Sequence, residues 1–326
     1  MDGLRAISIA LVVAGHLGKN GHAPLIFKSY LTDLGVDFFF IISGYLITTI
    51  LLEEWRQHST INLREFYLRR AYRIFPAAFV FMFIAIAIYW RQMHWYNVAA
   101  AFLYVANFDA SRPWIFGQLW SLGVEEQFYL IWPSVLRKWY QHRTTILIGV
   151  SILAPLIQAL LYFVKVPGGN FGAWPGVATT LAAGCLLAIL APRIPKIGKS
   201  WAFAMLVATF LISFFDANTP PKTLVLLFLL QPLKHFCMAG LVWHVVQNPY
   251  RVLNCLPAIW LGRISYSLYL WQQPFCADPK LQSAYLTFFA VLCAASSYYL
   301  VEKPMLRLRD RQMKYTLEIV QQPAGG

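Results

Sequence analysis

Long apolar runs alternate with short polar connections along most of the chain. Several runs are long enough for a helix to cross a bilayer, which takes about 20 apolar residues. Because lipid cannot satisfy backbone polar groups, spanning segments of this length are expected to be helical. We therefore predict an all-α, polytopic membrane helix bundle. About ten transmembrane helices are expected, at residues 4–18, 35–52, 74–91, 119–136, 145–164, 175–191, 200–215, 223–246, 259–276 and 283–302.

A shorter apolar run, 95–108, is interpreted as a re-entrant or interfacial segment on the outer side. If it spanned the membrane, the orientation of every later helix would be reversed. We assign residues 1–314 to a single transmembrane domain and expect 315–326 to be a disordered tail. No soluble domain is expected at either end, and the first apolar run contains no signal-peptide cleavage site.

The distribution of basic residues predicts the orientation of the bundle. With both termini in the cytoplasm, the inner connections carry most of the lysines and arginines, including Arg56 and Arg137. The outer connections carry fewer, including Lys28, Lys165 and Lys222. This bias follows the positive-inside rule and favours cytoplasmic termini.

The composition supports a membrane protein and argues against a nucleic-acid-binding one. Hydrophobic residues make up 59% of the chain and charged residues 13%, where a soluble domain has roughly 25% charged residues. The net charge of +13 is explained by basic cytoplasmic loops, so no nucleic-acid partner is expected. The five cysteines show no metal-binding spacing, and no metal is expected.

Two ionisable residues, Arg5 and His16, lie in the first apolar run. In a helix they share one face, separated by about three turns and about 16 Å. Ionisable groups inside lipid are costly and usually functional. The alternative is structural: Arg5 anchors the inner end of the helix and His16 is a polar residue at its outer end.

Carboxylates on two other helices are expected at the depth of His16. Asp37 begins the second helix from the outside, and Glu125 and Glu126 lie in the outer half of the fourth. A neutral imidazole takes a hydroxyl proton near neutral pH, and a carboxylate on its other nitrogen would hold it in place. We assign His16, Glu125 and Asp37 to the catalytic group, favouring Glu125 over Glu126 because Ser121 and Tyr129 share its face. Asp37 could instead cap its helix.

A basic stretch on the inner side contains Arg69, Arg70 and Arg73. Guanidinium groups bind phosphate oxygens well, so these residues, with Arg5, are assigned to a phosphate-bearing donor. The alternative is contact with anionic membrane lipid. Lys234 and Arg263 are further charges in apolar runs: Lys234 needs a carboxylate partner that the sequence does not identify, whereas Arg263 can reach the inner interface.

Several short motifs, taken together, resemble the acyltransferase 3 family of integral membrane O-acyltransferases. The resemblance covers nearly the whole chain. The matching segments are Asp2-Gly3-Leu4-Arg5-Ala6 with His16, Asp37 to Tyr45, Arg69-Arg70-x-x-Arg73-x-x-Pro76, Trp120-Ser121-Leu122 with Glu125 to Tyr129, Ser265 to Trp271, and Glu302-Lys303-Pro304.

The resemblance implies an acyl-CoA donor, usually acetyl-CoA, bound from the cytoplasm, and a requirement for Arg5 and His16. It implies transfer of an acetyl or short acyl group to a hydroxyl of an extracytoplasmic glycan or lipid-linked glycan at a bacterial inner (plasma) membrane. Gln272 stands where many relatives have histidine; glutamine is not a base, so an acceptor or structural role is expected. The alternative function is a proton-coupled transporter or flippase, since buried ionisable residues also suit proton relays.

Overall fold

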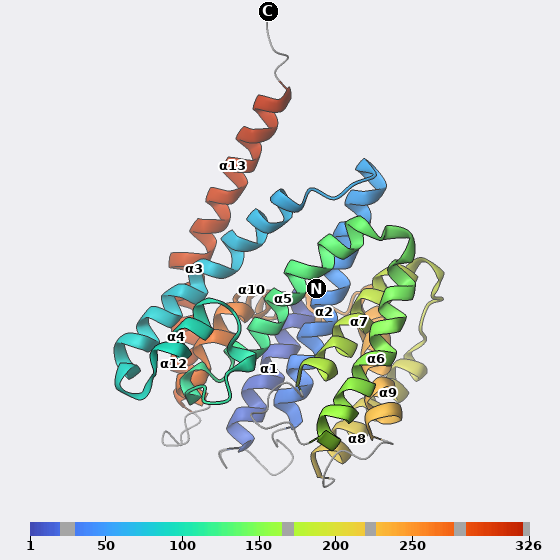
Figure 1. The fold of residues 1–326 in the computed structure, drawn as a ribbon, viewed down its shortest axis with the longest axis horizontal. Helices are drawn as coiled ribbons and strands as arrows, with labels where there is room; N and C mark the ends of the chain where they lie inside the picture. Colours follow the sequence, from blue (N-terminus) through green and yellow to red (C-terminus); the bar gives the residue numbers. More distant parts are fainter. Residues whose placement is uncertain (20–29, 165–172, 219–225, 277–284, 322–326) are drawn as a thin grey trace, which may run out of the picture.

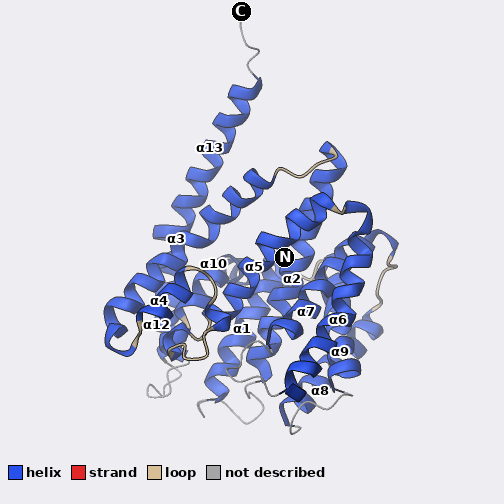
Figure 2. Ribbon diagram, in the orientation of Figure 1, coloured by secondary structure: helices blue, strands red, loops and turns tan. Residues whose placement is uncertain are grey.

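The computed structural model describes residues 1–19, 30–164, 173–218, 226–276 and 285–321, and these residues contain helices and no strand (Figures 1 and 2). The α-helices are α1 (Asp2–Lys19), α2 (Tyr30–His58), α3 (Leu63–Tyr89), α4 (Trp95–Phe102), α5 (Leu119–Lys138), α6 (Arg143–Val164), α7 (Ala173–Leu190), α8 (Lys199–Asn218), α9 (Gln231–Gln247), α10 (Leu256–Trp271), α11 (Gln273–Cys276), α12 (Leu286–Ser297) and α13 (Lys303–Gln321). The all-α prediction is confirmed for the described part of the chain.

Each predicted spanning segment coincides with a helix, although residues 223–225 and 283–284 lie outside the described residues. Five helical segments are long and apolar enough to cross a membrane by length and composition: Tyr30–His58, Leu63–Gln92, Tyr140–Leu161, Gly176–Arg193 and Lys199–Ala217. In the short run 95–108, α4 has 8 residues. At 1.5 Å per residue it covers about 12 Å, too little to span a bilayer.

Two predicted helix starts are wrong. The second helix begins at Tyr30 rather than at residue 35, so Asp37 lies about two turns inside α2 and does not cap it. The third helix begins at Leu63 rather than at residue 74, where the side chain of Asn62 accepts a hydrogen bond from the backbone of Glu65. The basic stretch with Arg69, Arg70 and Arg73 therefore lies within the first turns of α3.

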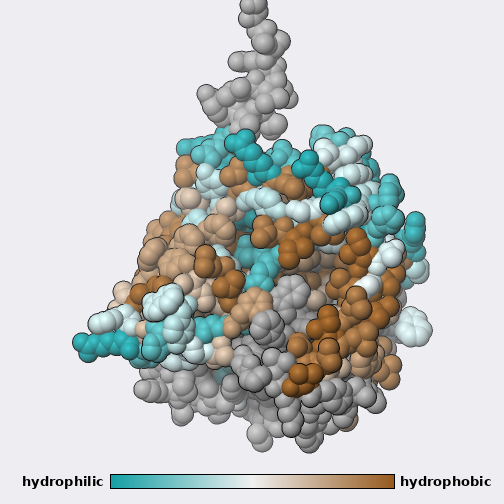
Figure 3. Space-filling view, viewed as in Figure 1, coloured by the Kyte–Doolittle hydropathy of each residue, from teal (hydrophilic) through white to brown (hydrophobic). Residues whose placement is uncertain are grey.

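The two ends of the bundle differ in polarity. The α2–α3, α5–α6 and α7–α8 connections lie at the end from which α13 projects (Figure 1). Hydrophilic residues gather at this end, and apolar residues cover much of the flank below it (Figure 3). Exposed apolar side chains on the long helices include Leu153 and Leu160 of α6 and Phe203 and Leu211 of α8. Lys28, Lys165 and Lys222 of the predicted outer connections lie outside the described residues.

The predicted tail falls partly outside the described residues. Helix α13 continues to Gln321, and residues 322–326 are not described. Disorder of 315–326 therefore stays a prediction.

Helix α2 lies at the centre of the bundle, between α1 and α7, and glycines allow the close approach. A Cβ atom added to Gly44 would lie 2.4 Å from the carbonyl oxygen of Leu181 on α7. A Cβ atom added to Gly184 would lie 2.3 Å from the carbonyl oxygen of Ile41 on α2. Small residues at such positions let membrane helices pack backbone to backbone.

We expect Gly44→Ala to destabilise the protein, because the added methyl group must push α7 away from α2. Overpacking of this kind typically costs about 1–3 kcal/mol. Gly149→Ala is the matched control, since a Cβ atom at Gly149 meets nothing within 4 Å. Thermal unfolding in detergent should show a lower midpoint for the first variant and little change for the second. Equal midpoints for the two variants would contradict this packing.

Candidate functional site

A cavity opens between α1, α2, α3, α5 and α10, and we call it the arginine cavity. Its lining residues are Arg5, Val36, Phe39, Phe40, Ser43, Arg70, Arg73, Ile74, Ser121, Leu122, Glu125, Tyr129, Ser265, Tyr266 and Tyr269. Three guanidinium groups and several hydroxyls therefore face one space within the bundle.

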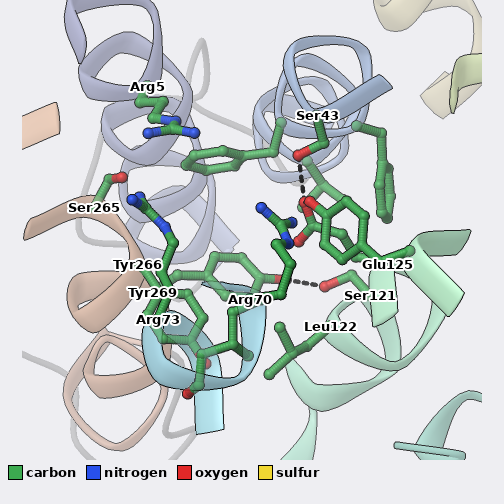
Figure 4. Close-up of a pocket in the computed structure, with 15 residues that line it drawn as sticks. Arg5, Ser43, Arg70, Arg73, Ser121, Leu122, Glu125, Ser265, Tyr266 and Tyr269 are labelled. Carbon is green, nitrogen blue, oxygen red and sulfur yellow. Dashed lines mark hydrogen bonds between the residues drawn. The ribbon is translucent and has the colours of Figure 1, made fainter. Parts of the chain in front are cut away.

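The cationic side of the arginine cavity is formed by Arg5 from α1 and by Arg70 and Arg73 from α3 (Figure 4). Arg70 and Arg73 are three residues apart, so their side chains share a helix face. The guanidinium carbon of Arg70 lies 3.4 Å from the centre of the Tyr129 ring. Its buried Nε has no hydrogen-bond partner among the described residues, so Arg70 keeps donor capacity for a ligand.

Beside Arg70, Glu125 organises a group of hydroxyls (Figure 4). Its Oε1 accepts hydrogen bonds from the Ser43 hydroxyl of α2 and the Tyr129 hydroxyl of α5. One turn away, the hydroxyls of Ser121 and Tyr269 are hydrogen-bonded to each other (Figure 4). The expected polar stripe of Ser121, Glu125 and Tyr129 is thus confirmed as a feature of the cavity wall.

Glu126 faces another space from Glu125. It lines a neighbouring cavity with Tyr104, and its Oε1 is buried without a partner among the described residues. Arg70 and Tyr129 line both this cavity and the arginine cavity, so the stacked pair lies between the two. The structure therefore places Glu125, and not Glu126, in the arginine cavity, as its helix face predicted.

His16 is held by Gln272, the residue that departs from the family motif. Nδ1 of His16 lies 2.6 Å from Oε1 of Gln272, and the Gln272 side chain is fully buried. An amide oxygen only accepts, so in this arrangement Nδ1 donates and Nε2 carries the imidazole lone pair. The expected acceptor role of Gln272 agrees with this contact. A carboxylate was expected beside an imidazole nitrogen, but at Nδ1 the partner is the side-chain amide of Gln272.

Asp37 lies apart from Glu125. Its Oδ2 is 2.8 Å from Nζ of Lys234 on α9, which supplies the partner that the sequence left unidentified. Asp37 and Lys234 line a second cavity that adjoins the arginine cavity at Val36. Asp37 and Glu125, which were grouped at one depth, therefore line two adjacent cavities, and Asp37 is paired with a buried lysine. Catalytic roles for His16, Glu125 and Asp37 stay predictions.

The three arginines of the basic stretch divide between two surroundings. Arg70 and Arg73 face the arginine cavity, whereas Arg69 pairs with Glu65 at 2.6 Å and with Glu54 at 3.8 Å. Neighbouring helix positions point about 100° apart, which explains the division. Arg5 was expected near the inner end, far from Glu125, but both line the same cavity, so the depth estimate for these two residues is wrong.

Three residues that line or adjoin the arginine cavity were not identified as functional from the sequence. Tyr266 and Tyr269 lie three residues apart on α10, a spacing that places both on one face and is visible in the sequence. The buried Glu302 accepts a hydrogen bond from Ser267 and lies within electrostatic reach of Arg73. Only the fold brings Glu302 close to α3, so no local signal identifies this contact.

We expect Gln272→Leu to lower kcat about tenfold with little change in the donor KM, because His16 loses the acceptor that orients its ring. Removing a residue that orients the ring of a functional histidine typically costs about 10- to 100-fold. Gln273→Leu is the control: it removes a buried hydrogen bond to the Trp114 carbonyl but no contact with His16. Gln272→His restores an acceptor and should recover activity. Equal kcat losses in the two leucine variants would indicate a merely structural role.

Comparisons with known proteins identify the relatives of this chain. A family model described as an acyltransferase domain matches residues 1–278. The chain is 30% identical to a peptidoglycan O-acetyltransferase of Listeria monocytogenes, over 93% of this chain and 53% of that protein. It is 27% identical to a putative peptidoglycan O-acetyltransferase of Bacillus subtilis, over 94% of this chain and 54% of that protein.

A putative O-acetyltransferase of Staphylococcus aureus is 28% identical, over 92% of this chain and 51% of that protein. The chain thus spans about half the length of the curated relatives that it matches. No solved structure matches it.

Proposed function

This chain belongs to the acyltransferase family, and we propose that it moves an acetyl group from acetyl-CoA to a hydroxyl of a glycan on the far side of the membrane. The arginine cavity is the observation that carries this proposal. It combines three guanidinium groups with a row of hydroxyls inside a helix bundle. Arginine is the side chain best suited to phosphate oxygens, and coenzyme A carries several phosphates.

The placement of Arg5 and His16 on one helix supports a path for the donor. Arg5 lines the cavity among the other arginines, and His16 lies eleven positions further along α1, about 16 Å away. Tyr269 lies among the hydroxyls that line the cavity. Gln272 follows it by three residues, at the end of α10, and is hydrogen-bonded to His16. Phosphates among the arginines would thus direct the thioester toward the imidazole.

The proposed reaction is acyl transfer with His16 as general base. Nε2 takes the proton of the acceptor hydroxyl while the oxygen attacks the thioester carbonyl. The tetrahedral intermediate then releases the thiolate, which takes up the proton from the imidazolium. The products are an acetyl ester and free coenzyme A. Positioned general bases typically contribute about 10²–10⁴ in rate.

The orientation of the bundle is part of the proposal. Basic residues at the end from which α13 projects, including Arg64 and Arg137, favour the cytoplasmic side for that end. The proposed topology has ten spanning helices with both termini in the cytoplasm. The proposed membrane is a bacterial inner membrane. Acetyl-CoA would then enter from the cytoplasm, and Glu125 would lie on its way to His16.

The acceptor is proposed from the relatives. Two of them are named for peptidoglycan, a glycan outside the inner membrane. We propose peptidoglycan, or a lipid-linked glycan precursor, as the acceptor of this chain.

The test uses the full chain in sealed proteoliposomes with radiolabelled acetyl-CoA on one side and peptidoglycan fragments on the other. Label esterified to the glycan, and released by mild base, supports the proposal. Movement of intact glycan across the membrane without label would instead support the transporter or flippase alternative. Empty liposomes are the control for leakage and spontaneous transfer.

A further inference from the structure

A second polar cavity lies between α2, α5, α6, α7, α8 and α9, and we call it the acidic cavity. Its described charged lining consists of Asp33, Asp37 and Asp216 against Lys234. Lys234 is already paired with Asp37. Among the described lining residues, the acidic side chains therefore outnumber the basic one.

The uncharged lining adds amides and an aromatic ring. Gln231 donates through Nε2 to Asp216, Gln158 lines the wall, and Trp120 presents its partly buried indole. The Trp120 ring is braced by Phe40, with centroids 6.3 Å apart. Carboxylates and amides accept hydrogen bonds from hydroxyls, and an aromatic face packs against apolar ring edges.

His235 closes one wall of the acidic cavity without adding charge. Its ring nitrogens lie 3.1 Å from the Thr179 hydroxyl and 2.9 Å from the Thr180 hydroxyl. Both contacts join α9 to α7. This wall is therefore polar, and threonine hydroxyls hold the imidazole in place.

The acidic cavity adjoins the proposed path of the donor. Val36 lines both cavities, and Trp120 precedes Ser121, which lines the arginine cavity. Helix α1 meets α2 at the same level: a Cβ atom on Gly15 would lie 2.4 Å from the backbone nitrogen of Thr32. His16 and Asp33 follow these two residues directly. The first turns of α2, which line the acidic cavity through Asp33, thus contact α1 next to His16.

We propose that the acidic cavity binds an uncharged sugar unit of the acceptor, with Trp120 under the ring, Asp216 accepting hydrogen bonds from its hydroxyls, and Gln158 donating to them or accepting from them. This inference rests on the proposed function, because that function makes the sugar the acceptor of the acetyl group. Binding of the sugar can nevertheless be measured without acetyl transfer. The Asp37–Lys234 pair joins α2 to α9 and forms the wall of the cavity. The proposed ligand of this cavity is a neutral sugar part of that acceptor.

The experiment measures binding of tetra-N-acetylchitotetraose to the full chain in nanodiscs, alongside acetyl-CoA binding. Trp120→Leu and Asp216→Asn are expected to weaken oligosaccharide binding at least tenfold and to leave acetyl-CoA affinity unchanged. Trp120→Phe retains an aromatic face and should bind more tightly than Trp120→Leu. Trp139→Leu and Asp310→Asn, at exposed positions, are the matched controls.

The outcomes separate this inference from the proposed function. No saturable binding by the wild-type chain, or equal binding by the Trp120→Leu and Trp139→Leu variants, would overturn the sugar site. Tighter binding of the anionic tetragalacturonate than of the neutral probe would overturn the assignment to a neutral sugar. Oligosaccharide binding that follows the variants as expected, in a protein that transfers no acetyl group, would support the site and reject the proposed function.

Discussion

His16→Ala should lower the rate of acetyl transfer by about 10²–10⁴, the usual contribution of a positioned general base. The substitution removes the proton acceptor that Gln272 orients through Nδ1. Acetyl-CoA binding should be nearly unchanged, because the arginines that line the cavity remain. The measurement is label transferred to glycan per unit of inserted protein, together with the donor Kd.

The control for this variant is His142→Ala, which removes an exposed imidazole in the α5–α6 connection. Membrane insertion and thermal stability should match the wild type in both variants. Transfer close to the wild-type rate in His16→Ala would exclude His16 as the base. A loss in His142→Ala of the same size would indicate a general effect of losing an imidazole.

The double substitution Arg70→Gln, Arg73→Gln should weaken acetyl-CoA binding by about 10²-fold or more. Charge-assisted hydrogen bonds contribute about 1.5–3 kcal/mol each, and about 1.4 kcal/mol corresponds to a tenfold change in Kd. The wild-type Kd should rise with ionic strength more steeply than that of the double variant, because the variant has lost two of the cationic groups. Titration of acetyl-CoA at two salt concentrations measures both effects.

Arg69→Gln is the matched control for the double variant. It removes the same kind of charge from the adjacent position, but that charge is held by Glu65 and Glu54 outside the arginine cavity. Donor affinity should change little. An equal loss of affinity in Arg69→Gln would assign the basic stretch to general attraction of anions, including anionic lipid.

The sequence predicts the bundle well because apolar runs of spanning length have few alternative structures. It also predicts which face of α5 is polar, since Ser121, Glu125 and Tyr129 follow the helical repeat. The helix starts are less predictable. The first turns of α2 and α3 contain polar residues, and such residues are compatible with either a loop or a helix end.

Pairings between distant segments were beyond prediction. Lys234 and Asp37 are joined only because α2 packs beside α9, and Gln272 reaches His16 only because α10 packs beside α1. A single sequence gives only an approximate depth for each group and does not give its rotation toward a neighbour. For this reason Asp37 was grouped with Glu125, although the two line adjacent cavities.

Helix α1 runs without interruption from Asp2 to Lys19 and carries both Arg5 and His16. The separation of these side chains is therefore fixed by the backbone hydrogen bonds of one helix and not by any loop. Adding one residue between them would turn the imidazole by about 100° around the helix axis, away from Gln272. Evolution of this chain toward longer or shorter donors must therefore occur in the surrounding walls, because the spacing within α1 permits almost no insertion or deletion.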